Sequence, residues 1–403
     1  MTSALPKPTT LRVRLSSTAE TIVRQGHPWV FADSIRSQTR EGTAGELAVV
    51  FDRHDRFLAV GLYDPDSPLR IRVLHTGKPL KLDTAWWRTL FEKSLDRRAG
   101  HFNAKTNGLR WINGESDGWP GLVCDQYGEV LVLKIYSQAW FPHLEKILPL
   151  LLEKLKPQSI VLRLSRNIQD AVRKTYKLRD GDLLYGELNN EAVPFLESGL
   201  NFYADVIRGQ KTGFFLDQRE NRRKVEALSR GKHVLNLFSF SGGFSLYAAR
   251  GGATHVTSVD ITEHALKELQ KNWEANPVLA SVPHDEIQAD VFEWLEEAEG
   301  SYDLIIMDPP SLAKREIERG VASRAYEKLA FQGIKLLRKG GIMVCCSCSA
   351  HVSVEEFTES VRHAMRKSGR KFQELEVTGH APDHPCTVIE MNYLKAIYLK
   401  EIA

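Results

Sequence analysis

Residues 302–310 read Tyr-Asp-Leu-Ile-Ile-Met-Asp-Pro-Pro, and this stretch decides the fold. Its apolar run at 304–307 is typical of a strand that is buried in a parallel sheet. Proline cannot continue a central strand, so Pro309 and Pro310 end the run abruptly. We therefore expect Asp308 at the carboxyl edge of a sheet, which is where ligands bind in open α/β folds.

Strands and helices alternate around this stretch in the C-terminal half of the chain. The hydrophobic pattern predicts strands at 233–238, 255–260, 286–289, 303–307 and 341–346, and helices at 243–250, 262–275, 291–298, 322–338 and 353–367. This alternation is typical of an α/β fold with a doubly wound, Rossmann-like parallel sheet. A last strand at 392–400 is expected to add an antiparallel edge, through which two copies can pair as a homodimer unless something covers it.

The N-terminal half has a different pattern. Residues 10–75 contain short apolar runs separated by Asp, Gly and Pro, which predicts a small β-rich domain. Residues 83–100 read as a helix, and residues 109–206 read as a small α/β unit. We therefore predict a β-rich domain at 10–77, a middle α/β domain at 83–206 and the Rossmann-like domain at 207–403.

Composition excludes several classes of protein. The 403 residues are 42% hydrophobic and 26% charged, as in an ordinary globular protein, and no apolar stretch reaches the roughly 18 residues that span a membrane. Residues 1–10 lack the apolar core of a signal peptide, so we expect a cytoplasmic protein that does not contact a membrane. The five cysteines show neither the number and spacing of a disulfide framework nor the two ligand pairs of a zinc site, so neither a disulfide framework nor a metal site is predicted.

Basic residues are unevenly distributed along the chain. The net charge is only +3, but residues 154–180 hold 8 basic and 2 acidic residues, and residues 1–80 have a smaller basic excess. A polyanion such as RNA can bind two patches of this kind. A solvated surface explains the same charges, and the sequence alone does not decide between the two interpretations.

A small-residue turn follows the first strand of the alternating region. Residues 239–243 read Ser-Phe-Ser-Gly-Gly and precede a helix, so a ligand can approach the backbone and the free N–H groups of the helix start. Asp260 ends the next strand, where a carboxylate can accept the hydroxyls of a ribose, and Asp290 follows the strand after that. The turn lacks the GxGxxG spacing of a dinucleotide site, which favours S-adenosylmethionine. The alternative is that the glycines only form a turn and Asp260 only caps a helix.

Three cysteines crowd at the end of the strand expected at 341–346. A thiolate that adds to C6 of cytosine makes C5 nucleophilic enough to attack a sulfonium methyl group. Cys348 lies between two serines and is expected in an accessible loop, whereas Cys345 and Cys346 are expected to pack inside the strand. A carboxylate near N3 assists the addition by keeping N3 protonated, and Asp308 is placed for that role.

Residues 210–219 read Gln-Lys-Thr-Gly-Phe-Phe-Leu-Asp-Gln-Arg, just before the alternating region. A cation, a flexible turn and two aromatic rings suit a segment that folds over a cofactor, with Lys211 and Phe214 in contact with it. The alternative is the charged start of a helix at a domain junction.

At these residues the chain resembles the bacterial RNA cytosine-C5 methyltransferases that act on large-subunit (23S) ribosomal RNA and carry an N-terminal PUA domain. The matching stretches follow one another at 27–31, 114–118, 211–213, 216–219, 235–239, 242–244, 258–260, 308–310, 347–349 and 383–385. The resemblance implies a PUA domain at 10–77, S-adenosylmethionine as methyl donor and Cys348 as nucleophile.

We expect a set of residues at the strand ends and in the 210–219 segment to hold the methyl donor. These are Lys211, Phe214, Asn236, Phe238, Ser239, Gly242, Asp260, Ile261, Asp290, Val291 and Asp308. The chain departs from the family pattern at one place. Many RNA cytosine-C5 methyltransferases have a second cysteine after the Asp-Pro motif that helps to release the product, but Ser311 follows Pro310 here.

Two other functions stay open beside cytosine-C5 methylation of RNA. An RNA N-methyltransferase would hold the amino group of adenine or guanine with Asp308 and would not need Cys348. A noncatalytic RNA-binding assembly factor would tolerate the loss of Asp260. In each case the β-rich domain and residues 154–180 are expected to bind the RNA backbone through charge.

Overall fold

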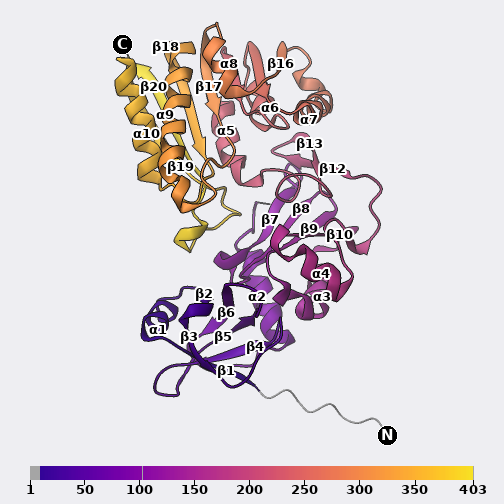
Figure 1. Cartoon of the computed structure of the whole chain (residues 1–403). Coiled ribbons are helices and arrows are strands. Elements are labelled where there is room, and N and C mark those ends of the chain that lie inside the picture. The colour runs from indigo at the N-terminus through magenta and orange to yellow at the C-terminus, as the bar shows by residue number, and fades with distance from the viewer. Residues whose placement is uncertain (1–9, 102, 403) are drawn as a thin grey trace. The chain divides into compact units, whose positions relative to one another are not determined.

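The computed structural model describes residues 10–101 and 103–402, which belong to two compact units (Figure 1). Unit 1 comprises Met1–Asn103, Asn107–Val193 and Ala204–Phe214, and unit 2 comprises Ala104–Thr106, Pro194–Tyr203 and Phe215–Ala403. Residues 1–9, which make up most of the stretch without a signal-peptide core, lie outside the described ranges. Within the described residues, no helix combines the length and the apolar content that crossing a membrane requires.

The N-terminal sheet of unit 1 has six strands in the order β2-β6-β5-β4-β1-β3. Its elements are β1 (Leu11–Leu15), α1 (Ser17–Arg24), β2 (Trp29–Phe31), β3 (Ile35–Gln38), β4 (Leu47–Phe51), β5 (Phe57–Tyr63) and β6 (Leu69–Thr76). Leu11, Val13 and Leu15 alternate with exposed residues along β1, because every second side chain of a strand points into the core. The β-rich N-terminal domain predicted from the sequence is confirmed.

The second sheet of unit 1 has the order β11-β10-β9-β8-β7. Its elements are α2 (Thr84–Asp96), β7 (Gly108–Asn113), β8 (Leu122–Tyr127), β9 (Val130–Ile135), α3 (Leu144–Leu155), β10 (Ser159–Leu164), α4 (Gln169–Tyr176) and β11 (Leu183–Gly186). Trp87, Trp119 and Trp140 fill its core, and the same core takes in Val60 and Leu62 of β5. This shared core explains why the two sheets form one unit, and the boundary between domains at 10–77 and 83–206 stays a prediction.

Unit 2 is built on a seven-stranded sheet with the order β16-β15-β14-β17-β18-β20-β19. Its strands are β14 (His233–Leu237), β15 (His255–Asp260), β16 (His284–Gln288), β17 (Tyr302–Met307), β18 (Leu337–Ser347), β19 (Lys371–Thr378) and β20 (Lys395–Ile402). Its helices are α5 (Arg219–Leu228), α6 (Gly243–Arg250), α7 (Glu263–Glu274), α8 (Val291–Glu297), α9 (Arg319–Leu336) and α10 (Val354–Ser368). Strands β14 to β18 pair in parallel, which confirms the predicted doubly wound fold.

The last strand does not lie where the sequence placed it. β20 pairs antiparallel with β18 on one side and with β19 on the other, so it is an inner strand and β19 is the edge. The prediction of an antiparallel edge at 392–400 is therefore wrong in position, because β19 covers that edge. A homodimer stays a prediction, and β20 is not the strand that would mediate it.

The two faces of the seven-stranded sheet carry different side chains. Leu235, Ile305 and Met343 point into an apolar core that α8, α9 and α10 complete. Asn236 and Ser258 point to the opposite face, where both meet the hydroxyl of Ser245 in α6 at 2.8 and 2.7 Å. Because side chains alternate along a strand, one face packs mainly apolar residues while the other holds buried polar groups below the carboxyl edge.

A two-stranded sheet of β12 (Ala192–Glu197) and β13 (Leu200–Asp205) also contributes to unit 2. Both carboxylate oxygens of Glu197 accept hydrogen bonds from Arg222 of α5 at 2.7 Å, and both side chains are buried. Tyr247 of α6 donates to the same carboxylate at 3.0 Å. This cluster ties the 194–203 segment to the helices of unit 2.

Replacing Glu197 by Gln should destabilise unit 2 strongly, because the guanidinium of Arg222 would be left buried without a full counter-charge. We expect a loss of about 3 to 5 kcal/mol in the free energy of unfolding. Glu226 and Arg250 form a matched control pair with similar geometry but side chains that are 27% and 21% exposed. Glu226→Gln should cost less than about 1 kcal/mol. Urea titrations that gave equal losses for the two variants would contradict this expectation.

Candidate functional site

The functional site is built at the carboxyl edge of the parallel strands of unit 2. Leu237 at the end of β14 pairs with Val259 of β15 on one side and with Met307 of β17 on the other. The residues that follow these strands are therefore neighbours, because parallel strands end at the same edge. The structure brings together the glycine turn, Asp260 and the Asp-Pro-Pro turn as the sequence predicted.

The turn after β14 has an unusual backbone. Phe238, Phe240 and Gly242 have φ angles of 59°, 47° and 82°, so three of five successive residues are left-handed. Such conformations are rare for residues with a side chain, and they gather at ligand sites. A Cβ added to Gly242 would lie 2.6 Å from Cγ of Leu269, so glycine is required there. Gly242 therefore lets the turn pack against Leu269 of α7, and the close approach of a ligand to this backbone stays a prediction.

Buried polar atoms in this region fit a polar ligand. The hydroxyls of Ser239 and Ser241 and the side-chain oxygen of Asn236 are buried and have no hydrogen-bond partner among the described residues. Buried polar atoms are normally paired, so an unpaired group of three marks a place where a ligand or water completes the bonding. A nucleoside cofactor such as S-adenosylmethionine supplies polar groups of this kind. The sequence placed Ser241 in the turn without predicting that it would be unpaired.

The two acidic residues behind the turn play different structural roles. Oδ2 of Asp260 accepts a hydrogen bond from the backbone of Phe240 at 2.9 Å, and Oδ1 accepts from the backbone and hydroxyl of Thr262 at 3.0 Å. Asp260 therefore closes the bend that leads into α7, and it also fixes the turn after β14. Asp290 is the N-cap of α8, where it accepts from the backbone of Phe292 at 2.8 Å.

The apolar residues named for the cofactor differ in exposure. Ile261 is 57% exposed directly after Asp260, whereas Val291, the first residue of α8, is buried in the apolar core. Phe238 is half-buried, with its ring 5.9 Å from that of Phe292. The exposed side chain of Ile261 and the half-buried ring of Phe238 suit contact with an aromatic base. Val291 packs in the apolar core instead.

Lys211 and Phe214 belong to unit 1, unlike the other residues expected at the cofactor. Phe214 is buried, and its backbone N–H donates to the hydroxyl of Tyr127 at 3.1 Å. Lys211 has a left-handed backbone with φ of 55°. That these two residues close over the cofactor stays a prediction.

Asp308 is oriented by a buried amide that the sequence did not single out. Nε2 of Gln218, which is 3% exposed, donates to Oδ2 of Asp308 at 3.0 Å. The amide oxygen of Gln218 in turn accepts from Asn221 at 2.6 Å, which fixes its orientation. A further buried pair, Arg219 with Asp383 at 2.9 Å, holds the start of α5. The segment at 216–219 thus fixes the orientation of Asp308 and holds the start of α5.

The three neighbouring cysteines lie in different environments. Cys345 and Cys346 are buried in β18, and burial raises the pKa of both thiols well above the ordinary value. Cys348 lies beyond the end of β18, is half-buried, and has its Sγ 3.8 Å from the backbone oxygen of Pro309. This arrangement agrees with the expectation that the first two pack and the third is accessible.

A network of hydroxyls joins the cysteine loop to the Asp-Pro-Pro turn. Oγ of Ser349 accepts hydrogen bonds from the backbone of Leu312 at 3.0 Å and of Ala313 at 3.2 Å. The hydroxyl of Tyr326 in α9 lies 2.8 Å from the same oxygen and accepts from Ser347 at 2.9 Å. The two loops are therefore held as one surface, with Asp308 and Cys348 on it. The sequence did not indicate Tyr326.

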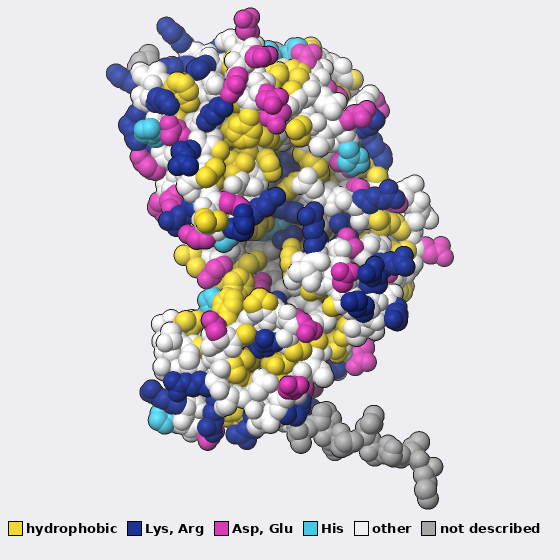
Figure 2. Space-filling view, viewed as in Figure 1, with side chains coloured by type: hydrophobic (Ala, Val, Ile, Leu, Met, Phe, Trp, Pro, Cys, Tyr) yellow, Lys and Arg dark blue, Asp and Glu magenta, His cyan; other side chains and the backbone are white. Residues whose placement is uncertain are grey.

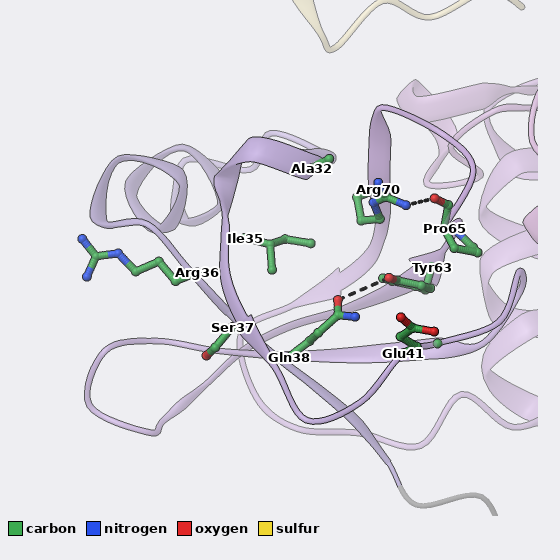
Figure 3. A pocket seen from close by; sticks show the side chains of 10 residues that line it. Ala32, Ile35, Arg36, Ser37, Gln38, Glu41, Tyr63, Pro65 and Arg70 are labelled. Carbon is green, nitrogen blue, oxygen red and sulfur yellow. Dashed lines mark hydrogen bonds between the residues drawn. The ribbon is translucent and has the colours of Figure 1, made fainter.

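Unit 1 contains a separate hollow of about 510 Å³ in its N-terminal sheet (Figure 3). Tyr63 donates to Gln38 at 3.2 Å on one side of the hollow, while Arg70 binds the backbone oxygen of Pro65. Arg36 extends away from it (Figure 3). On the face drawn in Figure 2, Lys and Arg side chains are interspersed with Asp and Glu. That this region binds RNA stays a prediction.

Comparisons with known proteins agree with this arrangement. The profile of S-adenosylmethionine-dependent methyltransferases matches residues 110–396, and the profile of PUA-like domains matches residues 13–76. A ribosomal RNA large subunit methyltransferase of Deinococcus radiodurans is 57% identical over 97% of each chain. Ribosomal RNA large subunit methyltransferase I of an Enterobacter strain is 32% identical over 98% of each chain.

Solved structures give the same picture. A protein described as a methyltransferase and solved in complex with SAH is 26% identical, with a TM-score of 0.83 over 97% of this chain and 100% of that chain. A Streptococcus mutans protein assigned as a SAM-dependent methyltransferase has a TM-score of 0.81 at 24% identity, over 97% of this chain and 100% of that chain, and shows the shared fold. The chain therefore uses S-adenosylmethionine and belongs to the family of large-subunit ribosomal RNA methyltransferases that carry an N-terminal PUA-like domain.

Proposed function

We propose that this protein transfers a methyl group to C5 of a cytosine in large-subunit (23S) ribosomal RNA through a covalent bond between Cys348 and C6 of the base. One observation carries the proposal. Cys348 is half-buried beside the Asp-Pro-Pro turn, with its Sγ 3.8 Å from the oxygen of Pro309, while Cys345 and Cys346 are buried in the strand. The relatives named ribosomal RNA large subunit methyltransferases support the substrate class.

The glycine turn and the strand ends around it would hold the methyl donor. Asn236, Ser239 and Gly242 line the turn, and Asp260 and Asp290 follow the next two strands. The unpaired hydroxyl of Ser239 and the glycine backbone suit a ligand that packs closely against the turn. When bound, S-adenosylmethionine supplies an electrophilic methyl group. The carboxylate of Asp260 would accept a hydrogen bond from a hydroxyl of its ribose.

Cys348 and Asp308 would act on the base. The Cys348 thiolate donates its electron pair to C6, which makes C5 nucleophilic enough to take the methyl group. Asp308, held by Gln218, hydrogen-bonds to the protonated N3, and this N3–H takes up the electron density that the addition pushes into the ring. The base must leave its stack to reach these residues.

Release of the product requires removal of the C5 proton. Many RNA cytosine-C5 methyltransferases have a second cysteine at the position that Ser311 occupies here. The hydroxyl of Ser311 donates a hydrogen bond to the backbone oxygen of Ala313 at 3.1 Å. That hydroxyl is thus engaged within its own loop. We propose that a water molecule takes the proton, after which the S–C6 electrons return to sulfur.

RNA binding would rest on unit 1. Exposed basic residues of the 154–180 segment include Arg173, Lys174, Lys177 and Arg179, and α4 carries the first two. Such residues bind the phosphate backbone and orient the RNA without reading its sequence.

The nucleophile can be tested by trapping. RNA that contains 5-fluorocytidine blocks the removal of a proton from C5, so wild type with S-adenosylmethionine should form an RNA adduct that survives denaturing electrophoresis. The adduct should disappear in Cys348→Ala and persist in the control Cys346→Ala, whose sulfur is buried. An adduct that persisted in Cys348→Ala would move the nucleophile to another cysteine. Methyl transfer to unmodified RNA without any adduct would favour the N-methyltransferase.

The cofactor turn can be tested with a pair of glycine variants. Gly242→Ala should weaken S-adenosylmethionine binding at least ten-fold by calorimetry, because its Cβ would meet Leu269 and shift the turn. Gly369 at the end of α10 also has a positive φ, of 70°, but an added Cβ meets nothing within 4 Å. Gly369→Ala should therefore leave the affinity unchanged. Equal affinities for the two variants would place the cofactor elsewhere.

The basic segment can be tested by the salt dependence of RNA binding. The logarithm of the affinity should fall linearly with the logarithm of the salt concentration. Lys174→Gln with Lys177→Gln should reduce the slope by roughly 0.7 for each phosphate that is no longer neutralised. Lys328→Gln is a control, because Lys328 is paired with Glu296 at 2.6 Å in unit 2. A slope that did not change in the double variant would remove α4 and its C-terminal end from the RNA-binding surface.

A further inference from the structure

Lys395 is a buried lysine next to the cysteine loop for which the reaction described above has no role. It begins β20 opposite Ser347 of β18, and its side chain is 1% exposed. Its ammonium donates hydrogen bonds to the backbone oxygens of Ser349 at 2.6 Å and Val352 at 2.5 Å. The first of these oxygens belongs to the residue after Cys348. A positive charge therefore lies within the loop that carries the cysteine.

The ammonium of Lys395 has no carboxylate bound to it. Over residues 10–101 and 103–402, no Asp or Glu oxygen forms an ion pair with its Nζ. The negative charge of Glu356 raises the pKa of Lys395. The oxygens of Glu356, however, contact Arg319 at 3.2 Å and the backbone N–H of Ser353 at 2.9 Å. A buried charge is costly unless an opposite charge accompanies it. The environment of Lys395 therefore favours a nearby anion.

Cys348 is suited to be that anion. Burial lowers the pKa of Lys395 to about 8, and Cys348 and Glu356 act on it in the opposite direction. A negative charge on Cys348 stabilises the protonated form of Lys395, and because Coulombic attraction is mutual, an ammonium at Lys395 favours a thiolate at Cys348.

His351, in the same loop, is exposed and its Nδ1 lies 3.3 Å from a carboxylate oxygen of Glu316, whereas the buried groups near the cysteine are weakly acidic. Tyr326 faces Cys348 from α9, and its pKa is raised by burial and, in part, by Cys348. Asp308 and Cys348 likewise raise the pKa of the Cys346 thiol in β18. These acidic and weakly acidic groups oppose a negative charge on sulfur, and the cation of Lys395 acts against that effect.

We propose that Lys395 is a positioning residue that stabilises the thiolate of Cys348 and holds the loop that presents the sulfur. The proposal rests on the role of Cys348 as nucleophile, and it assigns the activation of that nucleophile to a residue on another strand. A cysteine acts through its thiolate, and a neighbouring cation increases the thiolate fraction.

The same charge assists both ends of the reaction. The thiol of Cys348 loses its proton to solvent, and Lys395 balances the charge left on sulfur. The sulfur electron pair then forms the bond to C6. After C5 has taken the methyl group and lost its proton to water, the electrons of that C–H bond restore the C5–C6 double bond. The S–C6 electrons return to sulfur, and a stabilised thiolate leaves faster.

The test is the pH dependence of iodoacetamide alkylation at Cys348 in the full protein, without RNA or methyl donor, followed by peptide mass spectrometry. The wild-type thiol should titrate clearly below the ordinary pKa of about 8.5. Lys395→Met should raise that pKa by at least one unit and slow alkylation about ten-fold at pH 7. Lys395→Arg should keep it low. Lys400→Met is a matched control, because Lys400 is exposed on the same strand.

Each outcome decides the proposal. A wild-type thiol at or above its ordinary pKa would overturn it, and this result needs no variant to fold. A Lys395→Met profile equal to wild type, even with lost activity, would show that Lys395 only holds the loop. The measurement is independent of the nucleophile's role. An absent 5-fluorocytidine adduct would reject Cys348 as nucleophile, while alkylation alone judges thiolate stabilisation.

Discussion

Two neighbouring strands of unequal length create the site. Pro309 and Pro310 stop β17 after Met307, which pairs with Cys345 of β18. β18 nevertheless continues to Ser347, and its last residues are held on the other side by antiparallel β20. β18 therefore ends beyond the last residue of β17, and the loop that follows it, which contains Cys348, lies against the Asp-Pro-Pro turn. Without β20 the end of β18 would have no partner on either side.

The shortened strand leaves backbone groups that side chains must satisfy. Ser349 accepts from two backbone N–H groups of the loop after Pro310, and Tyr326 completes the network from α9. Lys395 does the same for two backbone oxygens. Buried polar groups lose free energy when they lack partners, so these side chains are as necessary to the loop as apolar residues are to the core. Structural support and tuning of charge are thus performed by the same residues.

The sequence predicted the helices and strands better than the contacts between residues far apart in the chain. The predicted helix at 243–250 coincides with α6, and Asp308 lies at the expected edge, because periodicity and proline act locally. β19 was missed, since the residues of Lys371–Thr378 are mostly exposed and show no apolar alternation. Gln218 meets Asp308 across 90 residues, and Lys395 meets Ser349 across 46. Contacts of that range depend on the strand order, which local patterns do not encode.

Cys345, Cys346 and Cys348 show how position decides chemistry. Successive residues of β18 point to opposite faces, so Cys345 enters the apolar core and Cys346 the polar face toward α5. Both are dehydrated, which disfavours their thiolates. Cys348 differs because β18 ends at Ser347, two residues beyond the point where β17 stops, and the loop that follows is bound by the ammonium of Lys395. Three identical side chains within four positions therefore divide into two packing groups and one candidate nucleophile, and the division follows from where each neighbouring strand stops.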